Sequence, residues 1–234
     1  MEQHLPKLLK DKNFSPNVSA KQKDQLKIMV KVCKFDCLKV SRQNRELSNF
    51  CLNGKERASL EFSLIEEEVL ASVSPVHGWR PKIAKIEEIC NPALEKKFKE
   101  RKNKCFSSYS DLKFHGTDNA GIINIPKEGF RDPKDGKVGM FGKGLYFTTC
   151  TSKSAQAIYT KGSNKILLCE LILGKSKRVE SHDYNLTLEK ICNEGFDSVF
   201  APSNTKAKGG VIHDEFVVYD KDQALPRYII HYTS

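Results

Sequence analysis

The carboxy-terminal half of the chain contains four short apolar runs that are separated by turn-forming residues. Each run is rich in β-branched or aromatic residues and is shorter than a typical helix, a pattern that favours strands. Few helical segments lie between the runs, which predicts mostly antiparallel pairing. The runs are KILLCELIL at 165–173, DSVFA at 197–201, EFVVYD at 215–220 and RYIIHY at 227–232.

The middle of the chain mixes strand and helix patterns. Asn91 and Pro92 open a helix, because proline is favoured in the first helical turn. Asp118 is suited to the N-cap of a second helix, and Thr151 or Ser152 to that of a third. Together with the later runs, this mixture predicts an α+β fold. The predicted strands cover 82–90 and 112–116, and the predicted helices cover 93–104, 119–126 and 154–161.

The amino-terminal part has a different character. Leu26–Val32 alternates apolar and polar residues like a half-buried strand, whereas apolar residues within 56–73 recur at roughly helical spacing. Pro75 and Gly78 then interrupt the pattern, so we expect a domain boundary there. The predicted parts are a small basic amino-terminal region of unassigned fold at 1–78 and a larger domain at 79–234.

The positive charge of the chain is unevenly distributed. The net charge of the 234 residues is +10. Residues 1–58 hold 13 Lys and Arg against 6 Asp and Glu, whereas residues 106–234 hold 17 against 15. A basic amino-terminal region beside a nearly neutral one is compatible with contact to DNA or RNA. A solvated lysine-rich surface accounts for the same composition equally well.

Composition also bears on localisation and on metal binding. There is no apolar run of 18 residues, and the amino terminus lacks the apolar segment of a secretory signal. We therefore expect no membrane contact and an intracellular protein, in the nucleus or the cytoplasm, with its eight cysteines reduced. Cys33, Cys37 and Cys51 are the one group that suggests a zinc site. Their spacing matches no common zinc finger and no histidine lies nearby, so we expect no metal.

The segment 139–147, GMFGKGLYF, is rich in glycine but fits neither common nucleotide-binding loop. Gly144 follows Gly142-Lys143 where a Walker loop needs Ser or Thr. The glycine offsets also differ from the dinucleotide fingerprint, and no βαβ unit surrounds them. What remains is a turn that allows close backbone approach and is followed by Tyr146, whose ring could stack on a flat ligand. A hairpin turn that leads into core aromatics is the alternative.

Two further segments carry polar groups at strand ends. FHGT (114–117) ends a predicted strand, and DEFVVYD (214–220) begins one with two carboxylates, which are poor strand formers. With GMFGKGLYF (139–147) and SKSA (152–155), these segments resemble the poly(ADP-ribose) polymerase (PARP) catalytic domain of the diphtheria-toxin-like ADP-ribosyltransferases. The resemblance runs from about Ile83 to Ser234, and we see none in residues 1–78.

The resemblance implies a split, mostly antiparallel two-sheet fold with flanking helices, which binds NAD in a cleft. It also implies a catalytic triad of His115, Tyr146 and Glu215. His115 is expected to bind a ribose hydroxyl, Tyr146 to stack on nicotinamide, and Glu215 to stabilise the oxocarbenium-like transition state. The NAD-binding residues that the resemblance implies are His115, Gly116, Thr117, Arg131, Tyr146, Phe147 and Ser154.

The implied function is transfer of ADP-ribose from NAD to an acceptor, with protein side chains as the expected acceptors. Because the chain is compact, single units or short chains are favoured over long polymers. The basic segment Ser203–His213 could receive an acidic target or product. The alternative is a catalytically weak NAD- or nucleic-acid-binding module that keeps the fold.

One position departs from the family pattern. The family usually places a second stacking tyrosine three residues after the position of Ser154, and this chain has Ala157 there. Tyr159 lies two residues further, roughly 200° around a continuous helix. Tyr159 can therefore replace the missing ring only if the backbone departs from helical geometry.

Overall fold

A computed structural model describes residues 54–206 and 208–233. The chain forms two compact units, Met1–Glu68 and Val69–Ser234. Helix α2, Gly54–Ala71, confirms the predicted helix over 56–73. The predicted strand Leu26–Val32 and the three cysteines considered for zinc lie outside the described residues, so those expectations stay predictions. Nucleic-acid contact by the basic region and the domain boundary at 78/79 also stay predictions.

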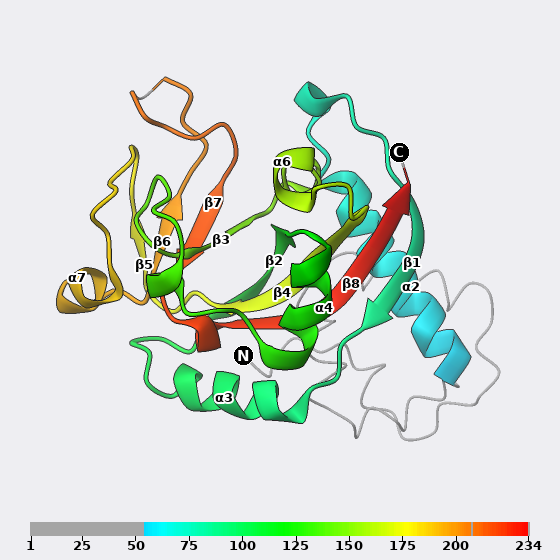
Figure 1. The fold of residues 1–234 in the computed structure, drawn as a ribbon, viewed down its shortest axis with the longest axis horizontal. Helices are drawn as coiled ribbons and strands as arrows, with labels where there is room; N and C mark the ends of the chain where they lie inside the picture. The colour runs from blue at the N-terminus through cyan, green and yellow to red at the C-terminus, as the bar shows by residue number, and fades with distance from the viewer. Residues whose placement is uncertain (1–53, 207, 234) are drawn as a thin grey trace, which may run out of the picture. The chain divides into compact units, whose positions relative to one another are not determined.

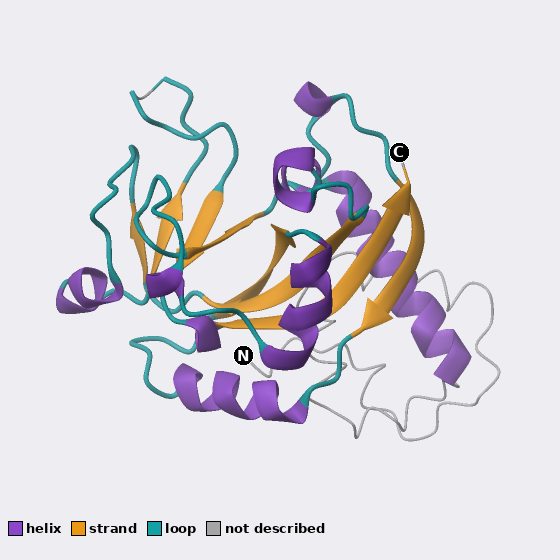
Figure 2. Cartoon of the chain, viewed as in Figure 1, coloured by secondary structure: helices purple, strands orange, loops and turns teal. Residues whose placement is uncertain are grey.

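The second unit is built on eight strands, which form one hydrogen-bonded series and are mostly antiparallel (Figures 1 and 2). Their order is β1-β8-β4-β2-β3-β7-β6-β5, and only β5 and β6 pair in parallel. The α+β fold and its mostly antiparallel sheet are thereby confirmed. The strands are β1 Lys82–Glu88, β2 Ser110–Gly116, β3 Leu145–Thr148, β4 Lys165–Ile172, β5 Ser176–Arg178, β6 Ser198–Ala201, β7 Glu215–Val218 and β8 Ala224–Thr233.

The series is weakest at its centre. Strand β2 pairs with β4 along its whole length, from Ser110↔Ile172 to Gly116↔Ile166. It pairs with β3 through the single pair Phe114↔Thr148, beyond which the two strands diverge (Figure 1). Two four-stranded halves therefore meet at one point, which is the form that the predicted split sheet takes. The divergence exposes the end of β2, where His115 and Gly116 lie.

Strand β4 is the apolar centre of the first half. It is buried along nearly its whole length because β2 and β8 flank it and helices cover both faces. Since side chains alternate along a strand, Leu171 and Ile172 belong to different faces. Leu171 lies in a core with residues of helix α4, Asn119–Glu128, whereas Ile172 packs with residues of helix α3, Pro92–Lys102.

The second half has a separate core. It joins β6 and β7 to helix α7, Leu188–Asn193, and includes Phe141 from the glycine-rich segment. Phe141 is fully buried, and the hydroxyl of Tyr219 donates a hydrogen bond to its carbonyl at 2.6 Å. The glycine-rich segment is thereby fixed to the second half before its chain enters β3.

Two of the three predicted helix caps follow the sequence, whereas the cap predicted at Thr151 or Ser152 is wrong because Cys150 occupies that position. Asn91 accepts a hydrogen bond from the backbone N–H of Leu94 at 3.2 Å, and Asp118 accepts one from Gly121 at 3.0 Å. Both predicted starts are confirmed. Helix α4 continues to Glu128, two residues beyond the predicted end, because Gly129 still donates to the carbonyl of Ile125. No helix in 54–206 or 208–233 has the length and apolarity to cross a bilayer.

The single helix predicted over 154–161 is wrong. The structure has two short helices, α5 Thr151–Ser154 and α6 Ala157–Thr160, separated by Gln156 in an extended conformation. The hydroxyl of Tyr232 donates a hydrogen bond to the carbonyl of Ala155 at 3.3 Å, and the Tyr159 amide bonds to Gln156. The Ala155 carbonyl, which a continuous helix would offer to that amide, is thus taken by a neighbouring strand. Nothing in the local sequence signals this break.

Candidate active site

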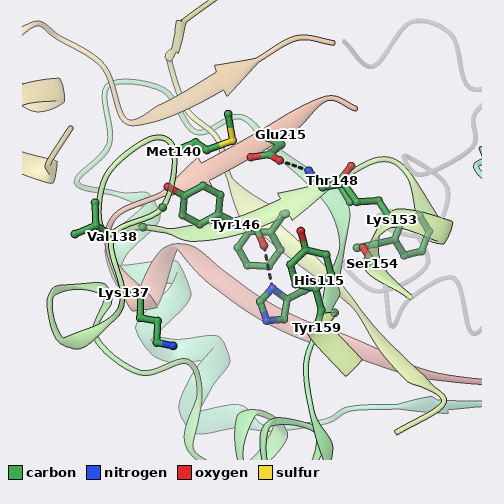
Figure 3. A pocket seen from close by; sticks show the side chains of 15 residues that line it. His115, Lys137, Val138, Met140, Tyr146, Thr148, Lys153, Ser154, Tyr159 and Glu215 are labelled. Carbon is green, nitrogen blue, oxygen red and sulfur yellow. Dashed lines mark hydrogen bonds and ion pairs between the residues drawn. The ribbon is translucent and has the colours of Figure 1, made fainter. Parts of the chain in front are cut away.

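A cavity of about 350 Å³ lies where the two halves of the sheet diverge (Figure 3). Its size falls in the range of small-molecule and cofactor sites. Side chains from β2, β3 and β7 meet there with those of α5 and α6 and of the glycine-rich segment. The residues that line the cavity include His115, Gly116, Val138, Gly139, Met140, Tyr146, Phe147, Lys153, Ser154, Tyr159 and Glu215.

His115 is held in one orientation. Its Nδ1 lies 2.9 Å from the carbonyl oxygen of Tyr146, so Nδ1–H donates and Nε2 is left as an acceptor. The ring also packs against Phe130 and Phe147, with centroids 5.2 Å and 5.1 Å away. Burial lowers the pKa of His115, although the Tyr146 carbonyl partly offsets this effect. A neutral imidazole with a free Nε2 suits acceptance of a hydroxyl proton from a ligand.

Tyr146 explains the glycine-rich segment. Its hydroxyl accepts a hydrogen bond from the Phe141 amide at 2.9 Å and donates one to the Gly142 carbonyl at 2.8 Å. Gly142 has φ +77°, which favours glycine, and a Cβ at Gly139 would overlap the Tyr146 ring. The segment therefore folds around the tyrosine hydroxyl and fixes the ring in the cavity wall. It does not have the form of a phosphate-binding loop.

Gly116 and Ser154 lie against each other at the end of β2. A Cβ at Gly116 would overlap the Ser154 carbonyl oxygen, a backbone atom that cannot move freely. Ser154 is buried, and its Oγ has no hydrogen-bond partner within the described part of the chain. An unsatisfied buried hydroxyl costs about 1–3 kcal/mol. A cavity-lining hydroxyl in this state is suited to a polar ligand group that completes it.

Glu215 stands at the start of β7 and is paired with Lys153 of α5 (Figure 3). Both side chains are largely buried, with 12% and 16% exposed. Such a pair holds the carboxylate in one position. Lys153 was not among the residues expected to act, although the quoted SKSA segment contains it. In the sequence, Lys153 is a lone lysine in a serine-rich turn, and such a lysine usually lies on the surface.

Tyr159 also lines the cavity, whereas Ala157 is exposed and does not. The backbone at Gln156 is extended and turns Tyr159 toward the site. This is the departure from helical geometry that Tyr159 needs in order to replace the missing ring. Burial and the charge of Glu215 raise the pKa of Tyr159. A second aromatic side chain is thus present in the wall, from a position that the sequence motif alone does not indicate.

The remaining expected residues occupy different places. Phe147 lines the cavity and is buried, where it supports the His115 ring. Thr117 follows β2, and its carbonyl accepts a hydrogen bond from Ser163. Arg131 is exposed and follows Phe130, next to the aromatic cluster. Thr117 and Arg131 lie outside the cavity wall described here, so their expected roles in NAD binding stay predictions.

The fold and the cavity define a mixed α+β domain with a candidate site where two mostly antiparallel half-sheets diverge. A family profile described as the poly(ADP-ribose) polymerase catalytic domain matches residues 59–234. The chain belongs to this family. The predicted family and its enzyme class, NAD+ ADP-ribosyltransferase, are thereby confirmed. The match begins at residue 59, before Ile83. The expectation that residues 1–78 lack any likeness to the family was therefore wrong for 59–78. Those residues contain none of the motifs that carried the resemblance, all of which lie between 114 and 220.

Curated relatives agree with the family but are longer proteins. The chain is 28% identical over 207 residues to poly [ADP-ribose] polymerase 2 of Zea mays, covering 75% of this chain and 31% of that protein. It is 33% identical over 135 residues to protein mono-ADP-ribosyltransferase PARP4 of Mus musculus, covering 53% and 7%. The chain thus spans less than a third of the length of these relatives. Their names include both polymer-forming and single-unit transferases.

Proposed function

We propose that this chain cleaves the bond between nicotinamide and ribose in NAD+ and transfers ADP-ribose to an acceptor protein side chain. The observation that carries this proposal is the buried Ser154 hydroxyl, which has no hydrogen-bond partner among the described residues and belongs to the same cavity wall as Gly116. A carboxamide is planar and has both a donor and an acceptor. The carboxamide of nicotinamide would form hydrogen bonds with both the Ser154 hydroxyl and the Gly116 backbone. Its ring would then lie between the rings of Tyr146 and Tyr159.

The donor is held along the cavity in a defined direction. With nicotinamide at Gly116 and Ser154, the free Nε2 of His115 is suited to accept a hydrogen bond from a ribose hydroxyl of the adenosine half. Arg131 is assigned to the same half, near its phosphates. Met140 and Val138 supply apolar surface from the glycine-rich side. These contacts position the donor and exclude water from the bond that breaks.

Glu215 carries the chemistry. As the bond breaks, its electron pair leaves with nicotinamide and positive charge develops on the ribose. A carboxylate fixed at the 2′-hydroxyl stabilises that charge, which exists mainly in the transition state. The acceptor oxygen or nitrogen then attacks the anomeric carbon, and its proton passes to Glu215 or to water. Lys153 holds the carboxylate in place during both events.

The acceptor side favours short products. The segment Ser203–His213 leads into β7 and is anchored at both ends, because Ser203 donates from its amide to Asp214 and from its hydroxyl to the Ile212 carbonyl, each at 2.7 Å. Lys206 and Lys208 are exposed there. We propose that this short basic segment receives acidic acceptor side chains and that one unit or a few are added.

The test compares Glu215→Gln with the wild-type chain and with Glu189→Gln, a matched change at an exposed glutamate of α7. Nicotinamide release and labelled ADP-ribose transfer are measured with NAD+. We expect Glu215→Gln to lower both rates about 10²–10³-fold, because the isosteric amide keeps the shape and loses the charge. Equal rates in all three proteins would contradict the assignment. A discrete labelled band rather than a smear supports single-unit transfer.

A further inference from the structure

Three metal-binding side chains from distant parts of the sequence converge outside the wall of the NAD cavity. His77 ends the 3-10 helix Pro75–His77, Cys150 precedes α5, and His213 lies two residues before β7. One ligand atom from each lies within 4.8 Å of the others, and the Nε2 atoms of the two histidines are 3.2 Å apart. We propose that His77, Cys150 and His213 bind one divalent metal ion of the zinc class.

The separation of the two nitrogens fits tetrahedral coordination. With Zn–N bonds of about 2.0–2.1 Å, two ligand nitrogens of a tetrahedral site lie roughly 3.3 Å apart. The Cys150 sulfur needs only a small closing movement to complete three corners. Two imidazoles and one thiolate form a borderline-soft set that suits zinc and disfavours magnesium or calcium. The fourth corner is open to water or to the amide of Gln156, whose Nε2 lies 3.3 Å from His77 Nε2.

Ser152 supports the proposed ligands from behind. Its Oγ accepts a hydrogen bond from the Ser74 amide at 2.9 Å and lies 2.8 Å from His77 Nδ1. With an ion bound through His77 Nε2, the imidazole proton would lie on Nδ1 and Ser152 would accept a hydrogen bond from it. The Ser152 hydroxyl proton would then be directed to the Cys150 sulfur, 3.3 Å away. Hydrogen bonds of this kind behind the ligands orient them in metal sites.

The backbone segments that carry the ligands are already fixed to one another. Thr151 donates from its amide to the Ser72 carbonyl at 3.2 Å and from its hydroxyl to the Val69 carbonyl at 3.0 Å. Gly78, at φ +59°, ends the 3-10 helix directly after His77. Because protein contacts hold these segments to one another, ion binding should cost little additional ordering.

The three proposed ligands differ in exposure. Cys150 is buried while both histidines are half-buried, so an ion can enter and the sulfur is shielded.

The proposed ion would connect the supports of the active site. Cys150 lies three residues before Lys153, and His213 lies two residues before Glu215. An ion shared by both segments would fix the spacing between them and tie both to the segment that precedes β1. The proposal departs from the sequence-based expectation of no metal, which considered only cysteines near the amino terminus.

The experiment uses the full chain without a histidine tag, carrying Cys33→Ser, Cys37→Ser and Cys51→Ser so that the amino-terminal cysteines cannot contribute. Metal content is measured after purification without chelators. The chelator-stripped protein is then titrated with zinc and separately with cobalt. We expect one zinc ion per chain, and a cobalt spectrum that combines thiolate charge transfer with the visible bands of a four-coordinate site.

Variants locate the ion. Cys150→Ser should abolish the charge-transfer band, and His213→Gln should abolish stoichiometric zinc binding. Ser152→Ala should weaken zinc binding about 10–100-fold, because it removes the group behind the ligands. The controls Cys192→Ser and His182→Gln change the same residue types outside the cluster and should bind as the parent does. The cobalt spectrum of the parent chain needs no variant to fold. A parent chain without zinc and without that spectrum, or equal zinc affinity in parent and His213→Gln, would overturn the proposal.

Discussion

The candidate active-site cavity and the histidine–cysteine cluster use the same two segments of the chain but differ in how they are encoded. Lys153 and Glu215 face the cavity, whereas Cys150 and His213, a few residues earlier in each segment, face the cluster. The cavity residues belong to contiguous motifs, because strand ends and a tight turn must be shaped locally. The cluster joins isolated residues, each of which is uninformative alone. The cavity residues can therefore be predicted from sequence motifs, whereas the cluster residues cannot.

The comparison also separates pre-formed contacts from contacts that await a ligand. In the cluster, the Ser152 hydroxyl has partners on every side. In the cavity, two residues along the chain, the Ser154 hydroxyl has none within the described residues. Buried hydroxyls are nearly always satisfied, so we expect Ser154, rather than Ser152, to bind a ligand.

After Glu215→Gln, the largest effect is expected at Gly116. In Gly116→Ala the added Cβ would displace the Ser154 carbonyl and press on Tyr159. Overpacking of this kind costs about 1–3 kcal/mol, and the displaced wall no longer matches the carboxamide. We expect nicotinamide release to fall by about 10² or more, since misplacement by an ångström has effects of that order. Glu189→Gln again serves as the control, because this exposed residue of α7 lies outside the cavity wall.

A smaller effect is expected at Tyr159. Removing the ring in Tyr159→Ala forfeits an aromatic contact worth about 0.5–1.5 kcal/mol, so KM for NAD+ should rise roughly two- to tenfold with kcat less affected. Tyr159→Phe keeps the ring and should behave nearly as wild type. Zinc stoichiometry should be unchanged in both variants. If KM is unaffected by Tyr159→Ala, the ring does not replace the missing family tyrosine.

The smallest effect concerns pH. Burial lowers the pKa of His115 in the folded protein, so the unfolded chain binds the proton more readily. Between the folded pKa and the usual value of about 6.5, the free energy of unfolding therefore decreases as pH falls. NAD affinity should weaken once Nε2 becomes protonated, below that window. Unfolding curves of wild type and His115→Gln between pH 5 and 8 test this, since the variant should show a shallower dependence. Parallel curves would contradict it.

The sequence predicted those parts of the site that depend on local geometry. His115 and Gly116 end a strand, Tyr146 follows a turn whose glycines fold around its hydroxyl, and Glu215 begins a strand. Each lies in a motif a few residues long, and the fold class followed from the same strand and turn patterns. The cap at Asn91 was equally local.

The parts that the sequence missed depend on contacts between distant residues. The break at Gln156, which brings Tyr159 to the cavity, is accompanied by a hydrogen bond from the Tyr232 hydroxyl on β8 to the Ala155 carbonyl. The role of Lys153 depends on Glu215, which lies more than sixty residues away along the chain. Neither contact has a periodicity or a spacing that a single sequence displays. The same reason hides the cluster.

The most direct test of the account is NAD+ binding to a chain that cannot consume it. Isothermal titration of Glu215→Gln with NAD+ is compared with the same variant carrying Ser154→Ala, and each unliganded protein is unfolded in denaturant. We predict that the added Ser154→Ala change weakens NAD+ binding about five- to fiftyfold. The unliganded protein should keep or gain stability, because the change removes an unsatisfied hydroxyl that costs about 1–3 kcal/mol. Equal affinity in the two proteins, or no binding by Glu215→Gln alone, would contradict the assignment of this cavity as the nicotinamide site.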